Sequence, residues 1–337
     1  MVETAKMTHK PLPATPGSPP HDAQVRSKTL QTKTLQNLAT EQRLSESLRI
    51  DEASALQIAE IINQEDKKVA VAVEKKLAVI AELIELAASS LKAGGRLLYF
   101  GAGTSGRLGV LDASECPPTF GTDPHMVQGF IAGGPNAMFK AQEGAEDLET
   151  GGAGAVEEAG VTQKDLVVGL AASGRTPYVH GALKEASKRG AATALICTVP
   201  SSQVHVNVDL LVDVPVGPEV IAGSTRMKSA TAQKMVLNMI TTGAMILLGK
   251  VYENVMVDLQ LTNEKLAERA RRILRMFTDL SDDEALRLLN RAGGHVKTAL
   301  IMEWTGCDAG EAKKMLDREH GNIRKVLAQD GPASGRS

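Results

Sequence analysis

The sequence predicts an α/β protein in which a five-stranded parallel sheet carries helices on both faces and a small helical module follows. Two observations support this. Five short apolar runs alternate with helical-period segments or glycine-rich turns, and strand–helix alternation is typical of a parallel sheet with right-handed crossovers. Alanine, glycine, leucine and valine dominate the sequence, as in proteins whose helices lie closely on such a sheet. The five runs are Leu97–Phe100, Val127–Ala132, Asp165–Ala171, Ala191–Thr198 and Asp209–Val214.

Composition excludes several classes of function. The chain has 337 residues, a net charge of −2 and 3% aromatic residues, which argues against nucleic acid as a partner. It has no run of about 18 apolar residues and no apolar leader, so we expect no membrane partner. Its three cysteines are far apart and lack the spacing of metal ligands. We therefore expect a soluble, cytoplasmic protein without disulfides.

The elements before the first strand follow from a change in composition. Residues 1–38 are polar and rich in proline, so we expect a disordered tail. Apolar residues at helical spacing then appear between Leu56 and Val73, and again over Val79–Leu91. Two helices are therefore predicted before the first strand.

Helical patterns return after the last strand. Residues 226–248 form a long apolar segment, and Glu264–Met276 forms another. Ser281 starts a capping-box pattern, Gly293 and Gly294 interrupt the helix that follows, and Gly321 has the position of a helix C-cap. We divide the chain into a main domain over 39–275 and a helical module over 276–330.

Three turns rich in hydroxyl groups follow predicted strands. Each alone is typical of a helix N-cap, but three at successive strand ends predict one crevice suited to a sugar or a phosphate. None has the Gly-Lys-Ser/Thr of a Walker loop, and the first lacks the third glycine of the dinucleotide fingerprint. The turns are Gly103-Thr104-Ser105-Gly106-Arg107, Ala172-Ser173-Gly174-Arg175-Thr176-Pro177 and Gly223-Ser224-Thr225-Arg226.

Two acidic residues lie beside these turns in the sequence. Glu115 precedes Cys116 and two prolines, where we expect the helix after the first turn to end. Glu146 lies in an acidic cluster after the second strand and a helix expected to start near Asn136. Such residues are often solvated surface, but two carboxylates beside an oxygen-rich ligand also suit general acid and base catalysis. Cys116 is interpreted as a small packed residue rather than a nucleophile.

Longer blocks of the sequence closely resemble the N-acetylmuramic acid 6-phosphate etherases, and the similarity runs from about Thr40 through Leu327. The blocks are Gly101-Ala-Gly-Thr-Ser-Gly-Arg-Leu-Gly109, Leu111-Asp-Ala-Ser-Glu-Cys-Pro-Pro-Thr119, Ala171-Ala-Ser-Gly-Arg-Thr-Pro-Tyr178, Gly217-Pro-Glu-Val220 and Gly223-Ser-Thr-Arg-Met-Lys228.

The resemblance implies a sugar isomerase (SIS) domain with a flavodoxin-like sheet and a small C-terminal helical module of UBA/CUE-like type. It implies a homodimer with its site near the subunit interface. The implied reaction converts N-acetylmuramic acid 6-phosphate to N-acetylglucosamine 6-phosphate and D-lactate in muramic acid catabolism, without a metal or organic cofactor. Lactate leaves by elimination, and water then adds to the unsaturated aldehyde.

The resemblance also implies residue roles. The two catalytic glutamates fall on Glu115, as the acid that protonates lactate, and Glu146, as the base at C2. Lys297 is a further candidate for the phosphate, and Leu44 stands where the family usually has asparagine. The expected phosphate contacts are Thr104, Ser105, Ser173, Gly174 and Thr176, with Ser224 and Thr225 as further candidates.

Two other functions fit the hydroxyl-rich turns. One is a non-catalytic sugar-phosphate binder like the glucokinase regulatory protein, which has two tandem SIS domains where this chain has room for one. The other is an aldose–ketose isomerase or aminosugar synthase, which lacks the block around Glu115. The presence of both glutamates favours the etherase.

Overall fold

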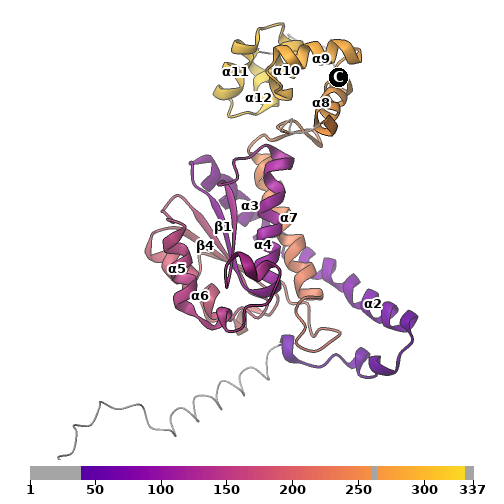
Figure 1. Cartoon of the computed structure of the whole chain (residues 1–337), viewed down its shortest axis with the longest axis vertical. Helices are drawn as coiled ribbons and strands as arrows, with labels where there is room; N and C mark the ends of the chain where they lie inside the picture. The colour runs from indigo at the N-terminus through magenta and orange to yellow at the C-terminus, as the bar shows by residue number, and fades with distance from the viewer. Residues whose placement is uncertain (1–38, 260–263, 331–337) are drawn as a thin grey trace, which may run out of the picture.

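The computed structural model describes residues 39–259 and 264–330, so the tail predicted over 1–38 lies outside the described residues. A central sheet carries helices on both faces, and a group of helices lies beyond one end of it (Figure 1). The strands are β1 Leu97–Gly101, β2 Val127–Ile131, β3 Leu166–Leu170, β4 Ala192–Cys197, β5 Leu210–Asp213, and the short pair β6 Val251–Tyr252 and β7 Val255–Met256. The α-helices are α2 Ala55–Glu74, α3 Leu77–Lys92, α4 Gly103–Phe120, α5 Glu149–Glu158, α6 Pro177–Lys188, α7 Lys228–Leu247, α8 Glu264–Phe277, α9 Asp282–Arg291, α10 Val296–Thr305, α11 Ala309–Arg318 and α12 Ile323–Asp330. The 3-10 helices are η1 Ala39–Glu41, η2 Ser45–Ser47, η3 Ile50–Glu52, η4 Pro135–Met138, η5 Ala145–Asp147 and η6 Ser201–Gln203.

The main sheet confirms the predicted fold class. Its strands are parallel and ordered β2-β1-β3-β4-β5, and each lies inside one of the five predicted apolar runs or within a residue of it. Alternate residues of β1 face opposite cores: Leu97 and Tyr99 pack with α3, α4 and α7, whereas Leu98 and Phe100 pack with α5 and α6. Both faces are buried, which is why these strands read as continuous apolar runs.

The helix after β1 does not end where the sequence predicted. α4 continues through Pro117 and Pro118 to Phe120, and it ends at Gly121 in the left-handed conformation, with φ of 62°. The two prolines remove hydrogen-bond donors from the last turns. Cys116 and Phe120 are nevertheless buried in the core, and this packing offsets the loss.

The segment after β2 also differs from the prediction. The helix expected near Asn136 is only the single 3-10 turn η4, and Glu146 lies in a second one, η5. Positive φ angles at Gly134 and Gly144 precede the two turns and prevent a continuous helix.

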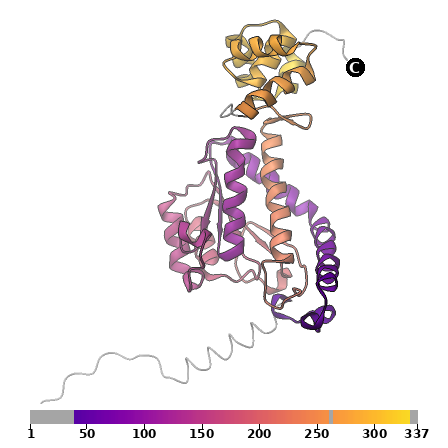
Figure 2. The ribbon, with the colours of Figure 1, turned by 45° about the vertical axis from the view of Figure 1, so that its right-hand side comes forward.

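The C-terminal helices form a core of their own. α8–α12 lie beyond the C-terminal end of α7, as both views show (Figures 1 and 2). Their apolar cluster begins at Val257 and includes Ile273 and Leu274 of α8, so α8 packs with the helices that follow residue 276. Ser281 and Asp308 form capping boxes at the starts of α9 and α11.

Candidate active site

Two helices begin at the carboxyl edge of the sheet, directly after two neighbouring strands, and run along opposite faces. α4 follows β1 and α6 follows β3, and these strands are neighbours at the point where the strand order reverses. Ligands of open parallel sheets bind at this switch point. The N-caps are Ala102 and Thr176, and neither makes a side-chain capping bond. The first N–H groups of α4, and those that follow Pro177 in α6, are thus available to meet an anion.

Close backbone contact shapes the first turn. A Cβ added to Gly106 would lie 2.7 Å from the carbonyl oxygen of Gly101, so only glycine lets α4 start this close to β1. Thr104 is partly exposed in the first helical turn, whereas Ser105 is buried. The Ser105 hydroxyl donates to Oε1 of Gln233 on α7 at 2.8 Å.

The second turn holds the next three predicted residues. Ser173 is partly exposed, and its hydroxyl accepts a hydrogen bond from the backbone N–H of Arg175 at 3.2 Å. Gly174 has a φ of +68°, and a Cβ there would lie 3.0 Å from Val204. Thr176 stands at the N-cap with its hydroxyl free of a capping bond. These residues therefore line the start of α6, as predicted.

The third turn differs from the first two, and the expectation of three open helix N-termini is wrong here. α7 begins at Lys228, and the buried carboxylate of Glu219 accepts hydrogen bonds from the N–H groups of Lys228 and Ser229, both at 2.9 Å. Ser224 and Thr225 lie before this start and are partly exposed. They can offer hydroxyl groups but not a helix N-terminus.

The sequence does not mark Glu219 as the residue that caps the start of α7. It lies nine residues before Lys228, so no local capping pattern of the kind that marks other helix starts could identify it.

Glu146 lies on a loop that contacts α6. η5, which carries it, packs against α6, and Glu146 itself is exposed. The loop is also tied to α4, because Arg107 donates hydrogen bonds to the carbonyl groups of Ala137 and Met138 at 2.7 and 2.9 Å. These contacts hold the loop that carries Glu146 at the edge where α4 and α6 begin.

Glu115 lies at the other end of α4. It is twelve residues beyond Gly103, which corresponds to about 18 Å at the rise of an α-helix. α4 runs back along the sheet, since Gly109 packs against Tyr99 and Phe120 packs in the same core as Leu97. One chain therefore does not bring Glu115 to the turns or to Glu146, although the sequence predicted a common crevice.

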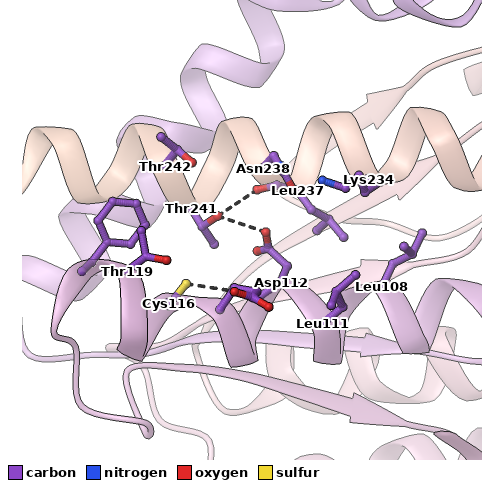
Figure 3. A pocket seen from close by; sticks show the side chains of 12 residues that line it. Leu108, Leu111, Asp112, Cys116, Thr119, Lys234, Leu237, Asn238, Thr241 and Thr242 are labelled. Atoms are coloured by element: carbon purple, nitrogen blue, oxygen red, sulfur yellow. Dashed lines mark hydrogen bonds between the residues drawn. The ribbon is translucent and has the colours of Figure 1, made fainter. Parts of the chain in front are cut away.

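Glu115 lines a pocket between α4 and α7 that encloses about 380 Å³ (Figure 3). The wall combines apolar side chains with two carboxyl groups, an amine, an amide, a thiol and hydroxyl groups. Its residues are Leu108, Leu111, Asp112, Glu115, Cys116, Thr119, Phe120, Lys234, Leu237, Asn238, Thr241 and Thr242.

Comparison with known proteins establishes the family. A model described as the glucokinase regulatory protein N-terminal SIS domain matches residues 79–187, and the SIS domain model matches residues 150–243. The N-acetylmuramic acid 6-phosphate etherase of Salinibacter ruber is 54% identical over 297 residues, which cover 88% of this chain and 96% of that protein. The protein of the same name from Clostridioides difficile is 51% identical and covers 88% and 97%. The chain belongs to the N-acetylmuramic acid 6-phosphate etherase family.

The etherase match decides between the alternatives left open by the sequence. It extends over almost the whole length of both relatives, whereas the regulatory-protein model matches only part of the SIS domain. The block around Glu115, on which the sequence favoured an etherase over an isomerase, thus belongs to a chain that matches an etherase over 88% of its length.

The pocket of this etherase-family protein contains a carboxyl that sequence reasoning gave no role. Asp112 accepts hydrogen bonds from the hydroxyls of Tyr99 and Thr241, both at 3.1 Å. Figure 3 shows the bond from Thr241. Burial raises the pKa of Asp112 to about 6, although these hydrogen bonds and Lys234 act in the opposite direction. Cys116 is buried in the core that contains α3, α4 and α7, as expected of a packed residue. Burial raises the pKa of its thiol to about 12.

Two further sequence predictions concern residues away from the turns. Lys297 lies on α10 and is buried, and its amine forms an ion pair with Asp258 at 2.7 Å. Lys250 pairs with the same carboxylate at 3.0 Å. Leu44 is buried, and Ser47 beside it donates a hydrogen bond to the carbonyl of Val220 at 2.7 Å. The segment around Leu44 therefore packs against the loop that leads to the third turn.

Neither a metal site nor a membrane span stands out in residues 39–259 and 264–330. No group of three or more His, Cys, Asp or Glu side chains there could hold a metal ion. None of the helices in these ranges is both long and apolar enough to cross a bilayer.

Proposed function

We propose that this protein cleaves the D-lactyl ether of N-acetylmuramic acid 6-phosphate to give N-acetylglucosamine 6-phosphate and D-lactate. Family membership supports the substrate. The observation that carries the proposal is the pair of helix N-termini without side-chain caps at the β1/β3 switch point, beside the loop that carries Glu146. A phosphorylated sugar suits this arrangement because it presents a dianion at one end and reacting carbons at the other.

In this proposal the start of α4 and the start of α6 hold the 6-phosphate together. Backbone N–H groups and two helix dipoles favour the negative charge, and hydroxyl groups add directed hydrogen bonds. Ser224 and Thr225 contribute hydroxyls from the third turn. The phosphate contacts are Thr104, Ser105, Ser173, Gly174 and Thr176.

The chemistry needs one base and one acid. Opening of the sugar exposes an aldehyde at C1, which acidifies the proton on C2. Glu146 removes that proton, the C3–O bond breaks, and Glu115 supplies the proton that departing lactate takes up. Water then adds at C3 across the resulting double bond, and the net reaction is hydrolysis of the ether.

A homodimer resolves the position of Glu115. We infer that a second copy lies so that Glu115 of one subunit faces the phosphate turns and Glu146 of the other. The length of α4 supports this, because Glu115 is about 18 Å from the turn of its own chain. A two-fold axis would create two equivalent shared sites.

We also place the protein in the cytoplasm. Cys116, Cys197 and Cys307 are all free thiols, and thiols persist in reducing compartments. Fractionation of the cells that express the protein would test the assignment.

The activity is tested by incubating the purified chain with N-acetylmuramic acid 6-phosphate and assaying D-lactate. We expect stoichiometric lactate and N-acetylglucosamine 6-phosphate. N-acetylmuramic acid without its phosphate is the matched control, and it should react far more slowly because the two helix N-termini lose their ligand. Absence of lactate at high protein concentration would contradict the proposal.

A further inference from the structure

A buried glutamine holds one of the proposed phosphate contacts. Gln233 lies on α7 with 1% of its surface exposed, and its Oε1 accepts the hydrogen bond that the Ser105 hydroxyl donates at 2.8 Å. α4 and α7 run in the same direction here, since Asp112 and Thr241 meet further along the same two helices. Gln233 therefore contacts the first hydroxyl-rich turn from the side of α7.

This hydrogen bond conflicts with phosphate binding. A serine hydroxyl has one proton, and a phosphate dianion offers only acceptors. While Ser105 donates to Gln233, it cannot donate to the phosphate. For the Ser105 hydroxyl to donate to the phosphate it has to give up this bond, and its oxygen can then accept a hydrogen bond from Nε2 of Gln233 instead.

Two buried polar atoms next to this hydrogen bond indicate how Ser105 could change its partner. Among the described residues, Nε2 of Gln233 and Oγ of Ser229 have no hydrogen-bond partner. Ser229 is fully buried and lies four residues before Gln233, so the two side chains are neighbours on one face of α7. Buried polar groups without partners are costly, and two of them adjacent to one hydrogen bond suggest a network poised to rearrange.

We propose that Gln233 is a positioning residue whose carboxamide turns over when phosphate binds. A half-turn about the Cγ–Cδ bond exchanges Nε2 and Oε1, and this torsion has two roughly equivalent orientations. Nε2 then donates to Ser105, Ser105 donates to the phosphate, and Ser229 donates to Oε1. The turned state pairs both of these atoms but takes the acceptor away from the Ser105 proton until phosphate supplies a new one, so phosphate binding favours the turned state. The proposal rests on Ser105 as a phosphate contact in the proposed function.

The first test replaces Gln233 by methionine, which keeps the length of the side chain and removes its amide. We expect KM for N-acetylmuramic acid 6-phosphate to rise about tenfold with kcat within about twofold, because Ser105 loses its orienting donor. The dissociation constant for inorganic phosphate should rise in parallel. In a Ser105→Ala background the same change should have less than about a twofold effect. Gln163→Met, on an exposed turn, is the control and should leave KM unchanged.

The second test, Ser229→Ala, separates positioning from structure. Removing a hydroxyl that has no partner in the free protein should leave the melting temperature equal or higher, while KM rises about threefold. A lower melting temperature with unchanged KM, or a Gln233→Met effect that persists fully in Ser105→Ala, would overturn the proposal. If the wild-type chain released no lactate, the phosphate-binding measurement would still test the network.

Discussion

At the scale of single residues, Asp112 links stability to pH. Its hydroxyl partners explain how it can be neutral: Thr241 can donate to the carbonyl of Leu237 at 3.2 Å while a protonated Asp112 donates to Thr241. Burial raises the folded-state pKa from 3.8 to about 6, so the folded chain keeps this proton to a higher pH than the unfolded chain does. The stability that Asp112 contributes is greatest below pH 3.8 and is lost as the pH rises to about 6.

Asp112→Asn should therefore stabilise the protein above pH 6. Asparagine can donate to Thr241 and accept from Tyr99 without ionising. We expect the variant's advantage in unfolding free energy to widen by roughly 1–2 kcal/mol between pH 5 and pH 7.5. Urea unfolding at the two pH values measures it. An advantage that stays constant or shrinks over this range would show that Asp112 is ionised in the folded protein at pH 5.

The proposed role of Glu146 as the base at C2 can be tested by exchange of the C2 proton. Glutamine has no basic oxygen that can take a proton from carbon, so Glu146→Gln should slow exchange of the C2 proton with solvent deuterium by about 10²–10⁴-fold. Proton NMR of substrate in deuterated buffer measures the exchange. Glu143→Gln, in the same loop, is the control and should exchange at the wild-type rate. Rapid exchange in Glu146→Gln would assign the base to another residue.

Individual residues differ in how well the sequence predicts their part in the site. The hydroxyl turns and both glutamates stand in recognisable blocks of the sequence, so they could be proposed as site residues from the sequence alone. Gln233 and Glu219 could not, because each acts on a partner distant in the chain: Gln233 on Ser105, and Glu219 on the start of α7. Contacts of this kind arise only after the sheet has aligned the helices.

At the scale of elements, the strands were predictable and one helix boundary was not. Burial on both faces makes each strand an apolar run with a clear beginning and end. Pro117 and Pro118 predicted an early end to α4 by local rules, and the packing of Phe120 against the core overrides them. Local signals therefore predict an element best where its tertiary environment agrees with them.

The stability of α7 is expected to depend on the carboxylate that caps its start. Glu219→Ala removes a fully buried carboxylate that accepts from two N–H groups, so we expect the unfolding free energy to fall by roughly 2–4 kcal/mol. Ser281→Ala, which removes an exposed cap at α9, is the matched control and should cost about 1 kcal/mol. Urea unfolding compares the two variants. A loss in Glu219→Ala no larger than in Ser281→Ala would mean that water replaces the carboxylate at α7.

At the scale of the whole molecule, the sequence could propose Glu115 and Glu146 as a catalytic pair, but its motifs do not indicate which chain would supply each one. Glu115 and Glu146 are close in the sequence, yet α4 carries the first to one end of the sheet and η5 holds the second at the other. The family resemblance implied a homodimer with its site near the interface, and the length and direction of α4 give a physical reason to propose one, because Glu115 is about 18 Å from the first turn of its own chain.

Mixing two inactive variants tests the shared site. Glu115→Gln and Glu146→Gln should each form inactive homodimers under the proposed mechanism. After co-refolding, half of the dimers should contain one chain of each kind, and each mixed dimer has one site with both glutamates intact. We therefore expect about a quarter of the wild-type lactate release per total protein. Glu115→Gln co-refolded with itself is the control and stays inactive. If both glutamates acted within one chain, the mixture would remain as inactive as its components, because neither variant then supplies a complete site.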